Sequence, residues 1–134
     1  MGSGDTAFQY YLYDQGRWGF SPWDQPDRYR NESALTWAPR AVAPFLIKHG
    51  TSDPTVGFIN DLAFYNALRY NGKKAVLLAY PNEGHHLAGL ANQRDLAVRF
   101  MELFDHYPKG AKAPAWLTEG VPYLKKDAKT EPGK

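Results

Sequence analysis

Two side chains in this sequence have the types and the setting for proton transfer, Asp53 and His85. Asp53 follows the apolar segment Phe45–Ile47, and His85 follows the apolar segment Ala75–Tyr80. A carboxylate that contacts an imidazole can fix one ring tautomer and stabilise the imidazolium once the ring has taken a proton. The pair could therefore work as an orienting acid and a general base. Each residue also has an ordinary structural interpretation. Asp53 could form a turn or a helix cap before Pro54, and His85 could be a loop residue that hydrogen-bonds to the backbone.

The segment between the two apolar runs has the periodicity of a helix. Its apolar residues recur three or four positions apart, at Phe58, Leu62, Tyr65 and Leu68. Gly72 follows as a C-terminal stop. A strand, a helix and a second strand in this order almost always give a parallel pair with a right-handed crossover. The carboxyl ends of both strands then lie at one sheet edge, where open α/β sheets bind their ligands. We therefore expect Asp53 and His85 on neighbouring loops.

Pattern and punctuation also predict where the elements begin and end. We expect strands over residues 42–48 and 75–80, with a helix over 57–71 between them. The polar residues of this helix are expected to face water, namely Asn60, Asp61 and Arg69. The proline-rich segment 21–40 predicts an ordered loop with short helices near 27–31 and 33–38.

A second amphipathic helix is expected after the base-bearing loop. Asn92 is its predicted N-cap, and Asp95 three positions later resembles a capping box. An apolar stripe follows at helical spacing, and Pro108 and Gly110 end the helix. Glu83 and Gly84 are expected to form the tight bend of the loop that precedes it.

Composition bounds the class of protein. The chain has 134 residues, a net charge of +2 and no cysteine. This charge balance argues against nucleic acid or an anionic membrane as a partner, and the absence of cysteine excludes disulfides and thiolate chemistry. No apolar run approaches the length of a membrane span. We expect a flexible leader over 1–8, one folded portion over 9–110 and a Pro/Lys-rich, partly disordered tail over 111–134.

A metal site is the competing interpretation of the histidine-rich loop. Glu83, His85, His86 and His49 carry the donor types that zinc prefers. However, the side chains of adjacent histidines diverge, and His49 is expected to have a structural role at the end of its strand. We therefore predict no metal. No phosphate-binding glycine loop is present either, and we expect no cofactor.

Two long motifs resemble a known family. The segments HGTSDPTV at 49–56 and YPNEGHHL at 80–87 are similar to the C-terminal motifs of the prolyl oligopeptidase family of serine peptidases. The dipeptidyl-peptidase and acylaminoacyl-peptidase branches are the most similar. The likeness continues upstream at 21–33 and downstream at 99–107. It implies the C-terminal part of an α/β-hydrolase fold, with parallel strands, flanking helices and an incomplete sheet.

The resemblance also implies residue roles. Asp53 corresponds to the acid of a catalytic triad and His85 to its base. It also implies substrate contacts. Val56 would form an apolar wall, and Thr55 stands where some members place an Asn that contacts the substrate. Tyr10 and Tyr13 would form an aromatic wall. Short peptides cleaved near their N-terminus are the implied substrates.

The nucleophile of such a triad is a serine on a strand-to-helix turn, within a G-x-S-x-G type motif. The serines of this chain are Ser3, Ser21, Ser33 and Ser52, and none has this setting. In these hydrolases the serine precedes the acid, so we expect it, with its strands, upstream of residue 1. The chain alone should then be inactive. Its open sheet edge would bind the upstream half of the domain or a second copy. The alternative is a non-catalytic interaction or oligomerisation module derived from a hydrolase.

Overall fold

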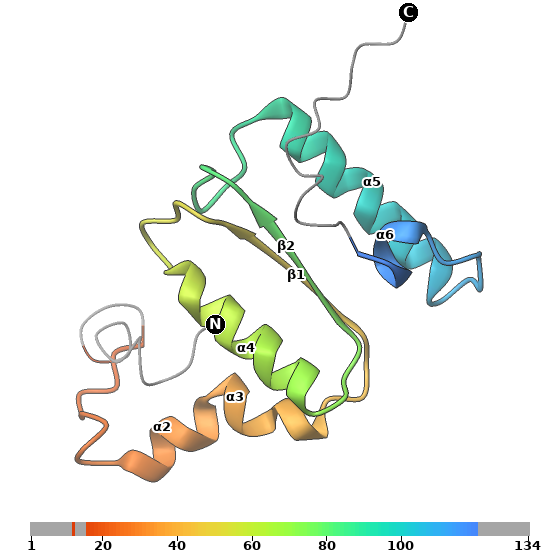
Figure 1. The fold of residues 1–134 in the computed structure, drawn as a ribbon. Helices are drawn as coiled ribbons and strands as arrows, with labels where there is room; N and C mark the ends of the chain where they lie inside the picture. Colours follow the sequence, from red (N-terminus) through yellow and green to blue (C-terminus); the bar gives the residue numbers. More distant parts are fainter. Residues whose placement is uncertain (1–11, 13–15, 121–134) are drawn as a thin grey trace, which may run out of the picture. The chain divides into compact units, whose positions relative to one another are not determined.

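The structure is a computed structural model of the 134-residue chain, and it describes residue 12 and residues 16–120. These residues form two strands, five α-helices and one short 3-10 helix (Figure 1). In chain order the elements are α2 (Pro26–Glu32), α3 (Ala34–Trp37), η1 (Ala38–Arg40), β1 (Phe45–Gly50), α4 (Phe58–Tyr70), β2 (Ala75–Tyr80), α5 (Leu90–His106) and α6 (Ala115–Thr118). The chain divides into two compact units, Met1–Asn92 and Gln93–Lys134.

The strands β1 and β2 form the predicted parallel pair, in a register that runs from Phe45 opposite Ala75 to Gly50 opposite Tyr80. The second strand has the predicted bounds. The first was predicted to begin at residue 42, and this is wrong, because β1 begins directly after Pro44. Proline has no N–H for a ladder, whereas the N–H of Phe45 donates to the carbonyl of Lys74 at 2.9 Å. The strand also runs two residues further than predicted, to Gly50.

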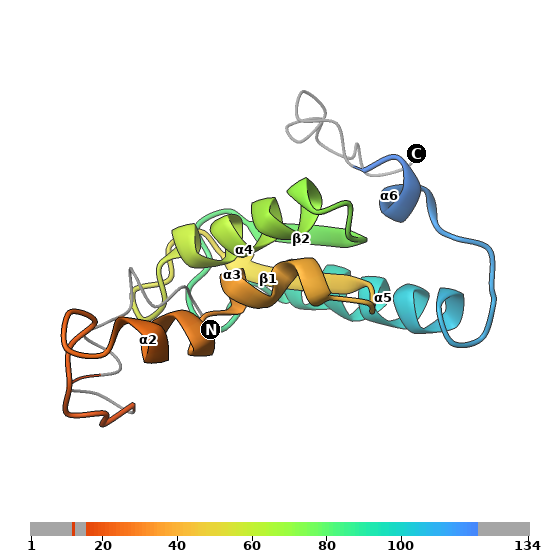
Figure 2. The same ribbon diagram turned by 90° about the horizontal axis from the view of Figure 1, so that it is seen from below.

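The crossover helix α4 lies along one face of the two strands (Figures 1 and 2). It begins after Gly57, and Gly72 follows it in the left-handed conformation at φ +68°, which glycine adopts without a steric penalty. Leu68 is fully buried and packs with Ala38 of η1 and Ala75 of β2. This small core fixes α4 against the sheet.

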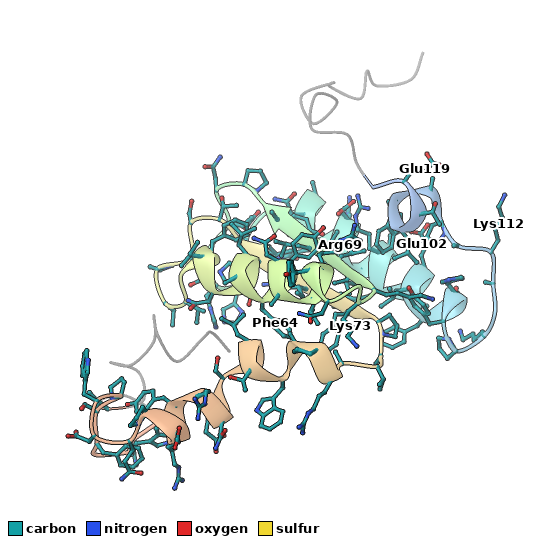
Figure 3. The ribbon with its side chains drawn as sticks, turned by 60° about the horizontal axis from the view of Figure 1, so that its bottom comes forward. Phe64, Arg69, Lys73, Glu102, Lys112 and Glu119 are labelled. Carbon is teal, nitrogen blue, oxygen red and sulfur yellow. The ribbon has the colours of Figure 1, made fainter. Side chains whose placement is uncertain are left out.

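Aromatic packing extends this core. Phe64 of α4, labelled in Figure 3, meets Phe45 of β1 edge to face, with 5.5 Å between ring centroids. Such pairs add about 0.5–1.5 kcal/mol to the free energy gained by burying their surface. The start of β1 is thereby held to the middle of the crossover helix.

The polar side of α4 differs from the prediction at two of its three residues. Arg69 is exposed as expected. Asn60, however, is buried, and its side-chain amide donates to the carbonyl of Gly57 at 3.0 Å. Asp61 is partly buried and contacts His49. His49, at the end of β1, reaches this first turn of α4, and helical periodicity alone does not reveal such a contact.

The proline-rich segment forms the two predicted short helices, α2 and α3, with η1 directly after α3. Tyr29 of α2 is buried, and its hydroxyl donates to the carbonyl of Phe20 at 3.0 Å. The ring of Trp18 packs edge to face on Tyr29 at 4.8 Å. The segment before β1 is thus ordered by an aromatic cluster.

The second unit contains most of α5, together with α6. Glu102 of α5 accepts the indole N–H of Trp116 from α6, and the guanidinium of Arg99 lies over the same indole at 5.2 Å (Figure 3). These contacts fix α6 within the region predicted as a partly disordered tail. Within the described residues, no helix combines the length and the apolar character needed to cross a membrane.

Candidate active site

Asp53 and His85 meet at the carboxyl ends of β1 and β2. The carboxylate Oδ2 of Asp53 lies 2.8 Å from the ring Nδ1 of His85. The Asp53 side chain is only 4 % exposed, whereas that of His85 is 48 % exposed. A buried carboxylate that contacts Nδ1 places the proton of the neutral ring on that nitrogen. The other nitrogen, Nε2, is then an acceptor on a side chain that solvent or a substrate can reach.

The acid-bearing loop also binds Oδ1, the second carboxylate oxygen of Asp53. Oδ1 accepts the backbone N–H groups of Thr55 at 2.8 Å and Val56 at 3.0 Å. Burial alone would raise the pKa of Asp53. The hydrogen bonds from Val56, His85 and Thr55, together with the charge of His85, outweigh burial and lower this pKa to about 2. Asp53 is therefore ionised throughout the neutral pH range.

The base-bearing loop is organised by Glu83, a buried residue for which the sequence indicated only a bend. Its carboxylate accepts the N–H groups of Ala88 at 2.6 Å and Gly89 at 3.0 Å, and the side-chain amide of Asn92 at 2.6 Å. The bonds from Asn92 and Ala88 lower the pKa of Glu83, burial opposes this, and Gly89 and the charge of Lys48 add to the lowering. The loop that carries His85 is thus held closed by hydrogen bonds to an ionised carboxylate, that of Glu83.

The same contacts overturn the predicted cap of α5. Asn92 was expected at the N-cap, but the helix begins at Leu90, so Asn92 lies inside its first turn. The N–H groups that precede the helix bind Glu83, which reaches them from across the loop. Because this carboxylate already serves as their acceptor, the side chain of Asn92 donates to it instead of capping the helix.

The two loops touch through their backbones at Gly50. A β-carbon at this position would lie 2.4 Å from the carbonyl oxygen of Glu83 and 2.3 Å from that of Gly84. Beside it, the N–H of Ser52 donates to the carbonyl of Glu83 at 2.9 Å, and that of Thr51 to the carbonyl of Tyr80 at 3.0 Å. The missing side chain at Gly50 is what allows the acid-bearing and base-bearing loops to pack against each other.

Lys48 gives His85 a further support that sequence reasoning missed. Its ammonium donates to the backbone carbonyl of His85 at 3.2 Å. Lys48 stands on β1 opposite Leu78 of β2, within reach of the base-bearing loop. The signal in the sequence was a charged residue directly after the apolar run Phe45–Ile47.

His49 is buried and contacts the acid-bearing loop on one side and α4 on the other. Its Nδ1 lies 2.6 Å from Oδ2 of Asp61, and its Nε2 lies 2.9 Å from the carbonyl oxygen of Val56. Nε2 is also 3.5 Å from Oδ2 of Asp53. The predicted structural role of His49 thus takes the form of a bridge behind the acid.

The remaining predicted site residues fall in different places. Thr55 is exposed and Val56 is partly buried, next to Asp53, and it is their backbone N–H groups that hold the acid. Tyr10 and Tyr13 lie outside the described residues. Within residues 16–120, no three histidine or acidic side chains are grouped so as to hold a metal ion.

Comparison with known proteins assigns the sequence to a family. The sequence profile of the prolyl oligopeptidase family matches residues 2–111. A solved structure, the acylaminoacyl peptidase of Pyrococcus horikoshii, superposes with a TM-score of 0.61 at 24 % identity. The likeness covers 85 % of this chain and 20 % of that one, so the present chain spans about a fifth of that peptidase. No curated protein matches the sequence.

The structural likeness shows the fold, and the helices with their small parallel sheet are part of an α/β-hydrolase fold. The family profile covers far more than half of the chain, and it includes both loops at the carboxyl edge of the sheet. The chain therefore carries a serine-peptidase-like domain and belongs to the prolyl oligopeptidase family.

Proposed function

We propose that Asp53 and His85 are the acid and the base of a serine peptidase whose nucleophile lies outside this chain. The observation that supports this most strongly is the 2.8 Å contact between Oδ2 of Asp53 and Nδ1 of His85. Asp53 is buried and accepts two backbone N–H groups, whereas His85 is half exposed. This is the arrangement that a general base needs, because one ring nitrogen is fixed and the other is available.

The chemistry follows from this arrangement. Nε2 of His85 would take the proton of a serine hydroxyl as the oxygen attacks a peptide carbonyl, and would then give it to the leaving amine. Asp53, whose pKa of about 2 keeps it charged, would hold the ring orientation and stabilise the imidazolium. Glu83 and Lys48 would fix the loop and the backbone of the base.

Short peptides are the proposed substrates. The solved relative is an acylaminoacyl peptidase, and the motifs of this chain resemble those of peptidases that cleave near the N-terminus. Val56 lies beside the acid and could form an apolar wall for the residue that precedes the cleaved bond. Thr55, which is exposed on the same loop, could contact the substrate backbone.

The proposed partner is the upstream half of a hydrolase domain, which would bring the serine and its oxyanion donors. Within the described residues the sheet has only two strands, and parallel strands are usually covered on both faces and paired at their edges. Self-association through the same strand edges would instead support the alternative of a non-catalytic oligomerisation module.

Fragment complementation tests the proposal. The full 134-residue chain would be mixed with an upstream hydrolase segment chosen because it carries a serine in a G-x-S-x-G motif, and assayed on short chromogenic peptides. We expect no turnover from either component alone and measurable turnover from the mixture. His85→Ala and Asp53→Asn should abolish it, whereas His86→Gln, at the neighbouring exposed position, should retain most of it.

Other results would overturn parts of the proposal. Turnover by the chain alone that a serine-directed phosphonate blocks would contradict the missing nucleophile. Complementation that survives His85→Ala would contradict the role of the base. A stable self-associated chain that neither binds the upstream segment nor gains activity would favour the oligomerisation module.

A further inference from the structure

The ring of His49 faces acceptors with both of its nitrogens. The carbonyl oxygen of Val56 lies 2.9 Å from Nε2, and the carboxylate of Asp61 lies 2.6 Å from Nδ1. A second carboxylate, that of Asp53, lies 3.5 Å from Nε2, and the ring of Phe58 packs edge to face at 5.5 Å. The His49 side chain is 6 % exposed, so water has little access to it.

This environment determines how many protons the ring holds. A backbone carbonyl can only accept, so Nε2 must carry a proton. A neutral ring would then present the lone pair of Nδ1 to the carboxylate of Asp61, which also has only lone pairs to offer. Such an unbonded contact between a buried ring nitrogen and a partly buried carboxylate costs free energy. A second proton on Nδ1 turns the same contact into a charge-assisted hydrogen bond.

We propose that His49 is a buried imidazolium that ties the acid-bearing loop to α4, and that it thereby acts as a positioning residue for Asp53. The role in positioning rests on the proposed function of Asp53. The charge state of the ring rests on the geometry of His49 alone. His49 differs from His85, the proposed base, because its ring is buried and both of its nitrogens face groups of this chain.

The bridge has a clear mechanical consequence. Asp61 stands in the first turn of α4, and Val56 is the residue whose N–H holds Oδ1 of Asp53. His49 donates to both, so one charged ring connects the end of β1, the loop and the helix. Without it, Val56 would lose the contact that fixes its carbonyl, and the residue whose N–H holds Asp53 would be restrained on one side only. A displacement of about 1 Å at a catalytic group can cost on the order of 100-fold in rate.

Nitrogen-15 NMR of the full chain, labelled at its histidines, tests the charge state. We expect both ring nitrogens of His49 to show one-bond couplings to protons at pH 7. In Asp61→Asn the amide can donate to Nδ1, so His49 should retain only the Nε2 proton. The control is Asp105→Asn, which neutralises a helical aspartate paired with Lys109 and should leave the His49 signals unchanged.

An unprotonated Nδ1 in the wild-type chain at pH 7 would overturn the imidazolium, whatever the catalytic result. If Asp61→Asn unfolds the chain, the wild-type spectrum still decides the question. Two retained ring protons in a folded Asp61→Asn chain would also count against the proposal, because the counter-ion would then be unnecessary.

The complemented peptidase tests the positioning role. The glutamine of His49→Gln has its N–H donors on one nitrogen, so it cannot donate hydrogen bonds to Val56 and Asp61 from opposite sides as the ring does. This variant should lower kcat by about 10- to 100-fold with little change in KM. Asp61→Glu should recover more activity than Asp61→Ala, because it retains a carboxylate. An active mixture in which His49→Gln keeps its full kcat would overturn this role. A mixture with no activity in any variant would contradict the proposed function instead, while the ring spectra would still report on His49.

Discussion

A β-carbon on Gly50 would lie 2.4 Å from the carbonyl oxygen of Glu83. This separation is well inside van der Waals contact, and the obstructing atoms are backbone, which cannot rotate away as a side chain could. The last residue of β1 and the first residues of the base-bearing loop are therefore matched in shape. Both members of the acid–base pair depend on this contact for their relative position.

Gly50→Ala should consequently destabilise the chain. Overpacking of this kind typically costs roughly 1–3 kcal/mol, and here it would also separate the two loops. Urea unfolding of the variant measures the loss. Gly84→Ala is the matched control, because a β-carbon there would meet no atom within 4 Å, and its stability should change little. Equal stability of Gly50→Ala and wild type would mean that the two loops are not packed as described.

The core predicts a large effect at Leu68. This side chain of α4 is fully buried against η1 and β2, so Leu68→Ala leaves a cavity and should lower the free energy of unfolding by about 2–5 kcal/mol. Ile59→Ala on the same helix removes an exposed side chain and should have a small effect. Chemical denaturation of both variants provides the comparison. Similar losses would contradict the placement of α4.

Acid should weaken the fold through Asp53. Its pKa is about 2 in the folded chain and near 3.8 when unperturbed. A lowered folded-state pKa means that the stabilisation is complete above the unfolded value and disappears as pH falls from about 4 towards 2. Urea midpoints between pH 2 and pH 7 should therefore fall less steeply for Asp53→Asn than for wild type. Asp27→Asn, at an exposed helical position, should follow the wild-type curve, and parallel curves for all three chains would refute the assignment.

Glu83 should control the order of the base-bearing loop. Glu83→Ala removes the acceptor for Ala88, Gly89 and Asn92, and the amides of residues 88 and 89 should then exchange with solvent faster. Glu83→Gln keeps one acceptor oxygen and should show a smaller increase. Hydrogen exchange followed by NMR measures both variants, with the amide of Leu68 as an internal reference. Unchanged protection at residues 88 and 89 would show that other contacts close this loop.

Much of the fold could be predicted from the sequence because its strongest signals are local. The apolar runs at residues 45–47 and 75–80 and the helical spacing before Gly72 predicted the parallel pair and its crossover. Topology alone then placed Asp53 and His85 on adjacent loops. The start of β1 was misplaced because Pro44 limits the ladder, which apolar character does not show.

The supports of the site were harder to predict because they are contacts across loops. Asp61 lies on the polar side of α4, where periodicity predicts solvent, yet His49 at the end of β1 contacts it. Glu83 has the sequence context of a bend, and only the folded loop shows the backbone amides that it binds. Asn92 has the sequence signature of a helix cap, but the carboxylate of Glu83 binds the N–H groups before α5, and Asn92 donates to that carboxylate.

The strand register has an evolutionary consequence. Gly50 stands opposite Tyr80, so both loops leave the sheet from the same rung of the ladder. One residue inserted within either strand would shift its loop by about 3.3 Å and reverse the direction of each side chain beyond it. Extra residues between Gly72 and Lys74 would lengthen only a surface turn at the opposite end. Homologues should therefore accumulate length differences at that turn and keep a constant count of residues through both strands.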